Sequence, residues 1–402
     1  MSKKIRSYAI VTASYWAFML TDGALRMLVL LYFHNLGYSP VTLAFLFLFY
    51  EFFGIVTNLF GGWLGQHYGL KSTLITGLLI QPVALVALSF MNTGWSSVIA
   101  IPFVMIIQAL SGIAKDLTKM SSKTAVKFLV PEDQSSALFK WVSLLTGSKN
   151  AIKGVGFFLG GFLLQQVGFR IGLWSLASLI IVVLSLSVFL LPDYIGKSKV
   201  KIKIKSIFQQ NRQIKRLSGA RVFLFASRDI WFVVAIPVFL ASAFGWNYSQ
   251  VGGFMAFWVI GYGIVQSLAP VILKKWTKDS APTGKAALIV SLLLAAIMAS
   301  ITVIFSFDYY QQYTIIIGLL VFGAVFALNS SVHSFLVLEY AEGDKAAMNV
   351  GFYYMANAAG RLIGTLLSGL LFQYGGALWA LMGSTIFLLF CSAITRKLTA
   401  VN

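Results

Sequence analysis

The stretch NAIKGVGFFLGGFLLQQVG at residues 150–168 returns 207 residues later as NAAGRLIGTLLSGLLFQYG at 357–375. The two copies share their opening Asn-Ala, three leucines, a glutamine and the closing glycine. Leucine matches arise easily in apolar sequence, but Asn and Gln matches at one offset do not. The chain is therefore predicted to contain one structural unit twice.

The repeat reaches well beyond this stretch. At the same offset FLV-x-E at 128–132 returns, and Asp22 matches Asp229. GIV-x-x-L at 54–59 returns 209 residues later. The repeat predicts an N-terminal half over residues 1–192, a basic cytoplasmic linker over 193–219 and a C-terminal half over 220–402.

Composition indicates that lipid surrounds much of the chain. Apolar residues make up 58% of the sequence and charged residues 11%, a balance that a soluble domain of this length could not hide from water. Stretches long enough to cross a hydrocarbon core, roughly 20 residues each, lie at 8–33, 42–65, 72–92, 97–118, 141–166, 169–192, 220–243, 250–273, 285–307, 313–338, 349–373 and 376–395. We expect an all-α membrane protein with twelve transmembrane helices in two pseudo-symmetric six-helix halves.

The net charge of +19 could indicate a nucleic-acid partner, so the positions of the basic residues have to decide. They gather in alternate connections between the predicted spans, while the loops at 34–40, 92–94 and 245–249 contain no Lys or Arg. This asymmetry is typical of membrane proteins, whose cytoplasmic loops are basic. We expect a lipid bilayer as partner, both termini in the cytoplasm and no nucleic acid.

Residues that could ligate a metal or perform catalysis are too scattered to form a site. Cys391 is the one cysteine, and His34, His67 and His333 lie in separate segments. The sequence shows no concentrated set of nucleophile, acid and base, and no Gly-rich phosphate loop with Lys-Ser/Thr. It therefore predicts no catalytic residue, no enzyme activity, no metal, no cofactor and no drive by ATP.

A glycine-rich motif, GWLGQHYGLK, follows the second predicted span at 62–71. It resembles a cytoplasmic motif of the major facilitator superfamily, although Gln66 replaces a usual Asp and Leu70 a usual Arg. Glycines permit a tight turn and close approach of helices. The expected gate residues are Gly62, Gly65, Gly69 and Lys71. Two repeated six-helix halves also resemble this superfamily, which implies a substrate site between the halves near the membrane midplane.

Several segments carry a more specific likeness. They are TDGALRML at 21–28, FYE at 49–51, GGW at 61–63, SGIAKDL at 111–117, TGSKNA at 146–151, KGVG at 153–156 and RDIWFV at 228–233. These segments resemble the ArsJ organoarsenical exporters. The resemblance implies export of 1-arseno-3-phosphoglycerate, an unstable ester made by a glyceraldehyde-3-phosphate dehydrogenase. It further implies arsenate resistance, functional pairing with that dehydrogenase and a place in the bacterial inner membrane.

Basic residues inside the predicted helices are candidates for substrate binding. A Lys or Arg at the bilayer centre costs roughly 2.5–3.5 kcal/mol on insertion scales, so each needs a cavity or a partner. Arginine suits phosphate and carboxylate groups because its planar fork can bind both oxygens. Lys153 and Arg361 are favoured because no acid lies near them in sequence. The expected ligands of a small anionic substrate are Arg26, Lys153 and Arg361, with Lys149, Lys119 and Arg228 as weaker candidates.

The other candidates also have plain structural interpretations. Arg26 lies one helical turn from Asp22, so the two could form an intrahelical ion pair. Arg228 stands beside Asp229 and could lie close to the cytoplasmic surface. Lys119 belongs to a stripe of lysines at four-residue spacing, and it could be the residue that an anion meets first.

Carboxylates inside the predicted helices are candidates for proton coupling, namely Glu51, Asp22, Asp116 and Asp229. Glu51 is favoured because aromatic residues flank it, and apolar surroundings stabilise a neutral carboxyl group that no cation reaches. Asp22 and Asp229 could instead neutralise nearby basic residues. Proton antiport would suit an exporter, although the sequence excludes neither uniport nor another ion.

Two other functions fit the same residues. The chain could export another organic phosphate or a drug-like anion, since its many aromatic residues would also suit drugs. A transporter-like membrane sensor is the alternative from a different class. A neighbouring gene for the dehydrogenase would favour the arsenical cargo over the other anions.

Overall fold

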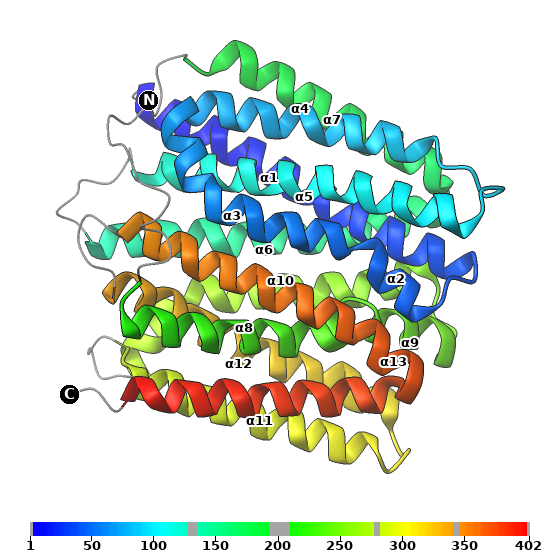
Figure 1. The fold of residues 1–402 in the computed structure, drawn as a ribbon, viewed down its shortest axis with the longest axis vertical. Helices are drawn as coiled ribbons and strands as arrows, with labels where there is room; N and C mark the ends of the chain where they lie inside the picture. The colour runs from blue at the N-terminus through cyan, green and yellow to red at the C-terminus, as the bar shows by residue number, and fades with distance from the viewer. Residues whose placement is uncertain (1–2, 128–134, 193–209, 277–281, 341–345, 400–402) are drawn as a thin grey trace.

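The computed structural model describes residues 3–127, 135–192, 210–276, 282–340 and 346–399, and helices form the regular structure of these ranges (Figure 1). The helices are α1 (Lys3–Asn35), α2 (Pro40–Leu46), α3 (Leu48–Tyr68), α4 (Leu70–Ser89), α5 (Ser97–Lys127), α6 (Ser135–Gln166), α7 (Gly168–Leu190), α8 (Arg212–Phe232), α9 (Ala235–Ala243), α10 (Tyr248–Trp276), α11 (Gly284–Phe305), α12 (Gln311–Glu339) and α13 (Ala346–Thr399). They run alongside one another, and α1 begins at the same end of the bundle at which α13 ends (Figure 1).

Two sets of helices, α1–α7 and α8–α13, lie side by side in the bundle (Figure 1). The first helix of the second set, α8, begins at Arg212, eight residues before the predicted start of the second half at 220, and the boundary between the halves stays a prediction. Asn211 caps this helix, since its side chain accepts a hydrogen bond of 2.8 Å from the Ile214 amide. The rest of the predicted linker, 193–209, and the repeated motif at 128–132 lie outside the described residues. The predicted pseudo-symmetry, in which a rotation would superpose one half on the other, stays a prediction.

Ten helical segments of the described residues are long and apolar enough to cross a membrane. The predicted spans at 349–373 and 376–395 fall in one segment, Asn349–Leu398, which Gly376 breaks with a φ of 65° and a ψ of −164°. The predicted span at 141–166 falls in α6, which is not among the ten and carries the polar run TGSKN. The predicted count of twelve therefore stays a prediction.

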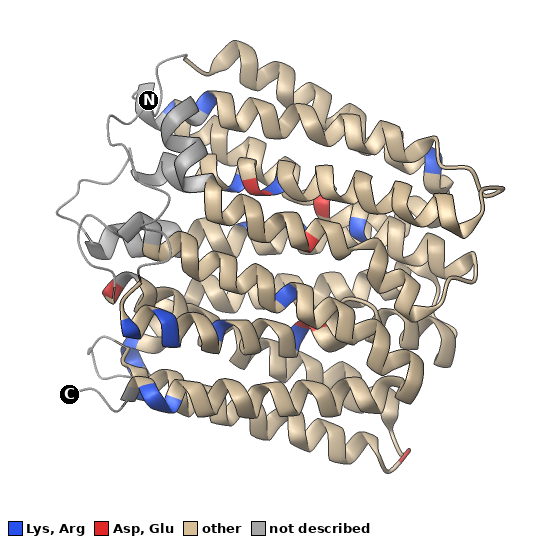
Figure 2. Ribbon diagram, viewed as in Figure 1, with Lys and Arg blue, Asp and Glu red and all other residues tan. Residues whose placement is uncertain are grey.

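The outer surface of the bundle is apolar, and its interior holds charged groups. Phe189 is 85% exposed and Val98 82%, whereas Asp22 and Glu51 are buried. Figure 2 shows acidic and basic residues together inside the bundle, with further basic residues at the end where α13 stops. This distribution suits lipid as the outer solvent, because the charges that would be costly in lipid face other helices.

Small residues bring the two sets of helices into contact at two levels. A Cβ on Gly263 of α10 would lie 2.6 Å from the Gly147 carbonyl oxygen of α6, and one on Gly161 would lie 2.3 Å from the Tyr248 carbonyl oxygen. Gly147 and Gly161 are about 21 Å apart along α6, at 1.5 Å per residue. Gly369 of α13 approaches α2 equally closely. The halves therefore meet over much of the length of the bundle.

The predicted gate segment lies where α3 passes into α4. Gly69 joins the two helices with a φ of 82°, a conformation that strains other residues. Lys71 donates a hydrogen bond of 2.6 Å to the Leu191 carbonyl oxygen, which ties the start of α4 to the end of α7. Gly62 and Gly65 lie within α3. Gating by these four residues stays a prediction.

Candidate functional site

A cavity of about 160 Å³ lies between the two sets of helices. Side chains of α1, α3, α5 and α6 line it from one set, and side chains of α8, α10, α12 and α13 line it from the other. Its basic lining residues are Arg26, Lys115, Lys119, Lys149, Lys153, Arg221, Arg228 and Arg361. The structure thus brings all six predicted substrate ligands into one cavity, while their role in binding stays a prediction.

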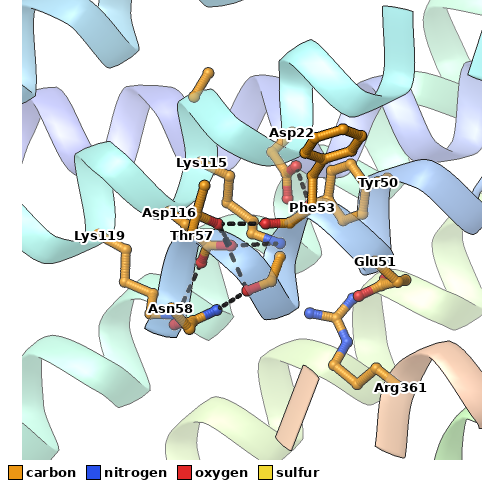
Figure 3. A network of polar contacts seen from close by, with 12 residues as sticks. Asp22, Tyr50, Glu51, Phe53, Thr57, Asn58, Lys115, Asp116, Lys119 and Arg361 are labelled. Atoms are coloured by element: carbon orange, nitrogen blue, oxygen red, sulfur yellow. Dashed lines mark hydrogen bonds and ion pairs between the residues drawn. The ribbon is translucent and has the colours of Figure 1, made fainter. Parts of the chain in front are cut away.

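Glu51 of α3 joins the two sets of helices through arginines. Its Oε1 atom lies 2.7 Å from Arg26 Nη2 and 2.5 Å from Arg361 Nη2. Arg361 belongs to α13, so this ion pair crosses from one half to the other (Figure 3). The sequence favours Glu51 as a proton carrier on the condition that no cation reaches it, and this condition is not met, because two arginines bind its carboxylate.

Asp22 of α1 binds Lys153 of α6 and not the arginine on its own helix. Lys153 Nζ lies 2.5 Å from Asp22 Oδ2, and the Tyr50 hydroxyl donates a hydrogen bond of 2.5 Å to Oδ1. The interpretation of Arg26 as the intrahelical partner of Asp22 is wrong. Asp22 does neutralise a cation, as expected, but that cation comes from another helix.

Asp116 of α5 holds two lysines of its own helix. Its Oδ1 atom lies 2.8 Å from Lys119 Nζ, and its Oδ2 atom lies 3.7 Å from Lys115 Nζ (Figure 3). The Thr57 hydroxyl donates to Oδ2 at 3.1 Å, and Lys119 also donates to Asn58 Oδ1 at 2.6 Å. Lys119 therefore meets the cavity with its ammonium group already held by an acid and an amide.

Asp229 of α8 lies between two arginines. Arg228 Nε donates to Oδ1 at 2.6 Å, and Arg361 Nε donates to Oδ2 at 3.3 Å. The Arg228 guanidinium also lies 4.9 Å from the centroid of the Phe225 ring. Since α8 begins at Arg212, it carries Arg228 to the cavity between the two sets of helices, while the distance of Arg228 from the cytoplasmic surface stays a prediction.

Two further cavity cations, Lys115 and Arg221, are missed by sequence reasoning. Lys115 lies near the end of the predicted span at 97–118, and it is buried with its Nζ 4.1 Å from the centroid of the Tyr50 ring. Arg221 reads as the edge of a span at 220–243, but it is 4% exposed and lines the cavity. Extending the seventh span back to the cap at Asn211 would have placed Arg221 inside the bundle.

The cavity carries more positive than negative charge. Leaving Lys149 aside, its seven other basic residues meet four carboxylates among the described residues, those of Asp22, Glu51, Asp116 and Asp229, which leaves an excess of three positive charges. Such an excess is costly inside a membrane unless an anion offsets it. Among the described residues, no group of three or more His, Cys, Asp or Glu could hold a metal ion.

Comparison with protein families gives a match over most of the chain. The family model described as the Major Facilitator Superfamily matches residues 11–279 and again residues 217–401. Among curated proteins, none matches the chain.

Proposed function

We propose that this chain, which belongs to the Major Facilitator Superfamily, exports a compact organic anion. Membership of the family makes the chain a secondary transporter of a small molecule across a membrane, and not an enzyme. One observation supports the anion as cargo, namely the excess of three positive charges, Lys149 left aside, that the described residues give the cavity between the two halves. An anion that binds there would offset those charges in a place where water cannot do so fully.

The size of the cavity favours a compact cargo over a drug-like one. Pockets for drug-sized ligands measure roughly 300–1,000 Å³, whereas this cavity measures about 160 Å³. Its lining combines basic groups with amides and hydroxyls, among them Asn58, Asn150, Ser330 and Tyr262. These groups suit an anion with several oxygen atoms.

The first cargo to test is 1-arseno-3-phosphoglycerate. The proposal of this cargo depends on the resemblance of the segments at 21–28, 111–117 and 228–233 to the ArsJ exporters. Export of this ester would confer arsenate resistance and would require a glyceraldehyde-3-phosphate dehydrogenase in the same cell. The bacterial inner membrane, with both termini in the cytoplasm, is the location that this function requires.

The proposal is tested by arsenate resistance in cells that lack their own arsenic efflux. The chain together with the dehydrogenase is expected to raise survival and to lower cell-associated arsenic, whereas either protein alone is not. Transport of 3-phosphoglycerate by purified protein in liposomes tests the wider proposal, because this stable compound carries a phosphate at one end and, in place of the arsenate, a carboxylate at the other. Transport without resistance would identify another organic phosphate as the cargo, and transport of no organic anion would contradict the proposal.

The same geometry suggests how export could be coupled to protons. Arg361 binds Glu51 across the two halves, and an anionic cargo would compete with that carboxylate for the guanidinium. Arg26 would remain on Glu51. When cargo takes Arg361, Glu51 loses one of the two cations that hold its negative charge, so binding of the cargo and protonation of Glu51 are linked.

Glu51→Gln is expected to insert and fold with a lower unfolding temperature, because buried Arg26 loses its carboxylate, to lose export driven by a pH gradient and to keep exchange of cargo across the membrane. Glutamine keeps the size and the hydrogen-bonding oxygen of Glu51, but it cannot carry a proton. Liposomes with and without a pH gradient separate the two activities. Glu339→Gln, at the exposed end of α12, is the matched control. An unchanged pH response in Glu51→Gln would reject Glu51 as the proton carrier.

A further inference from the structure

Arg221 of α8 stands apart from the other cavity cations. Among the described residues, no carboxylate lies within ion-pair distance of its guanidinium. Arg221 Nε donates to Asn357 Oδ1 at 2.9 Å, and Nη1 donates to the Ser330 carbonyl oxygen at 3.3 Å. These two acceptors are neutral, so they orient the guanidinium without offsetting its charge.

Aromatic rings hold the Arg221 guanidinium in place. Its central carbon lies 4.0 Å from the centroid of the Phe225 ring and 4.9 Å from that of Tyr353. Cation–π contacts of this kind stabilise a desolvated guanidinium only partly. The side chain is 4% exposed and lines the cavity, so the charge faces a confined space in which no carboxylate of the described residues offsets it.

Hydroxyl groups surround the same end of the cavity. The Tyr262 hydroxyl donates to Ser330 Oγ at 3.3 Å, and Ser334 Oγ donates to the Ser330 carbonyl oxygen at 2.8 Å. All three residues line the cavity. The Ser330 hydroxyl accepts from Tyr262 and keeps its own proton to donate, and a fixed guanidinium with a hydroxyl donor beside it is a combination that binds a phosphate or carboxylate group.

A second cation site lies further along the same helix. Arg228 follows Arg221 by seven residues, which is two turns and about 10.5 Å along α8. The Phe225 ring lies between the two guanidinium groups, 4.0 Å from that of Arg221 and 4.9 Å from that of Arg228. Arg361 joins Arg228 on Asp229 and extends this second site toward Glu51. The cavity thus offers two positive regions with an apolar ring between them.

We propose that Arg221 anchors a second oxyanion subsite, so that the cavity selects a cargo with an anionic group at each end. One group binds Arg221 and its hydroxyl neighbours, the other binds the region of Arg228 and Arg361, and Phe225 faces the carbon skeleton. This inference depends on the proposed function and narrows its substrate class from an organic anion to a two-headed one. A phosphate at one end and a carboxylate or arsenate at the other would meet this requirement.

The test compares a two-headed ligand with a one-headed ligand. Purified protein is titrated with 3-phosphoglycerate, which carries a phosphate and a carboxylate, and with glycerol 3-phosphate, which carries the phosphate alone. Arg221→Gln is expected to weaken binding of 3-phosphoglycerate at least about tenfold, as loss of a charge-assisted hydrogen bond does. Binding of glycerol 3-phosphate is expected to weaken much less, because a one-headed anion can use the remaining subsite.

A control variant and two contrary results complete the binding test. Arg212→Gln, at the exposed start of α8, is expected to change neither affinity. Equal losses for the two ligands would show that Arg221 only supports the shape of the cavity, and no loss would remove it from binding, so either result overturns the inference. If the wild-type protein binds neither ligand, this result would instead contradict the proposed function.

A measurement on the wild-type protein does not depend on the stability of a variant. Phenylglyoxal modifies arginine, and bound 3-phosphoglycerate is expected to slow modification of Arg221, as mass spectrometry of the peptide that contains it would show. Arg212 serves as the internal control, because it is exposed and outside the cavity. Equal rates for Arg221 with and without the ligand would overturn the inference.

Discussion

Replacement of Arg361 by glutamine is expected to abolish anion export and to leave the protein folded in the membrane. Arg361 is the guanidinium that links α13 to Glu51 of the other half, at 2.5 Å. Its removal leaves neither of its acids alone, since Arg26 remains 2.7 Å from Glu51 and Arg228 Nε 2.6 Å from Asp229. The variant therefore loses a ligand of the cargo, while each buried carboxylate keeps a basic partner.

The size of the effect follows from the bonds that the cargo loses. A hydrogen bond to a charged group contributes about 1.5–3 kcal/mol, which corresponds to roughly tenfold to 150-fold in affinity. Uptake of 3-phosphoglycerate into liposomes measures the loss, and the amount of protein in the membrane shows whether the variant folds. Arg212→Gln is the matched control outside the cavity. Transport at the wild-type rate by Arg361→Gln would exclude this residue from the anion site.

The location of the cavity cations could be predicted from sequence because a charged side chain in lipid has a high free-energy cost. A charge in an apolar helix is expensive in lipid, so Arg26, Lys153 and Arg361 had to face other helices. The structure places all three on one cavity between the halves. Membership of the Major Facilitator Superfamily agrees with the repeat and with the apolar composition from which the fold was predicted.

The partners of these cations could not be predicted from sequence. Spacing along one helix favours Asp22 for Arg26, but helices that are distant in the chain supply the actual partners. Glu51 reaches Arg361 across 310 residues of sequence, and Asp22 reaches Lys153 across 131. Only the packing of one helix against another decides such pairs.

Arg221 was not predicted as a cavity residue because the start of its helix was placed too late in the sequence. A window of apolar residues starts the seventh span at 220, because the residues before it are basic and polar. The cap at Asn211 starts α8 more than two turns earlier. Arg221 then lies inside the bundle and not at its edge, and this shift makes it available to the cavity.

Lys153→Gln is expected to lose stability as well as transport, unlike Arg361→Gln. Asp22 is 2% exposed, and among the described residues its ion pair is with Lys153, 2.5 Å away. Breaking a buried ion pair on one side costs about 3–5 kcal/mol, because a charge remains buried without its partner. The Tyr50 hydroxyl, also at 2.5 Å, donates a hydrogen bond but carries no charge.

A double variant separates the two effects of Lys153. Asp22→Asn with Lys153→Gln removes both charges, so it is expected to recover most of the unfolding temperature in detergent that Lys153→Gln alone loses. Transport of 3-phosphoglycerate is expected to stay low in the double variant, because the cavity still lacks the ammonium group of Lys153. A single variant as stable as the wild type would show that the Asp22–Lys153 pair does not stabilise the fold, and recovery of transport in the double variant would remove Lys153 from the anion site.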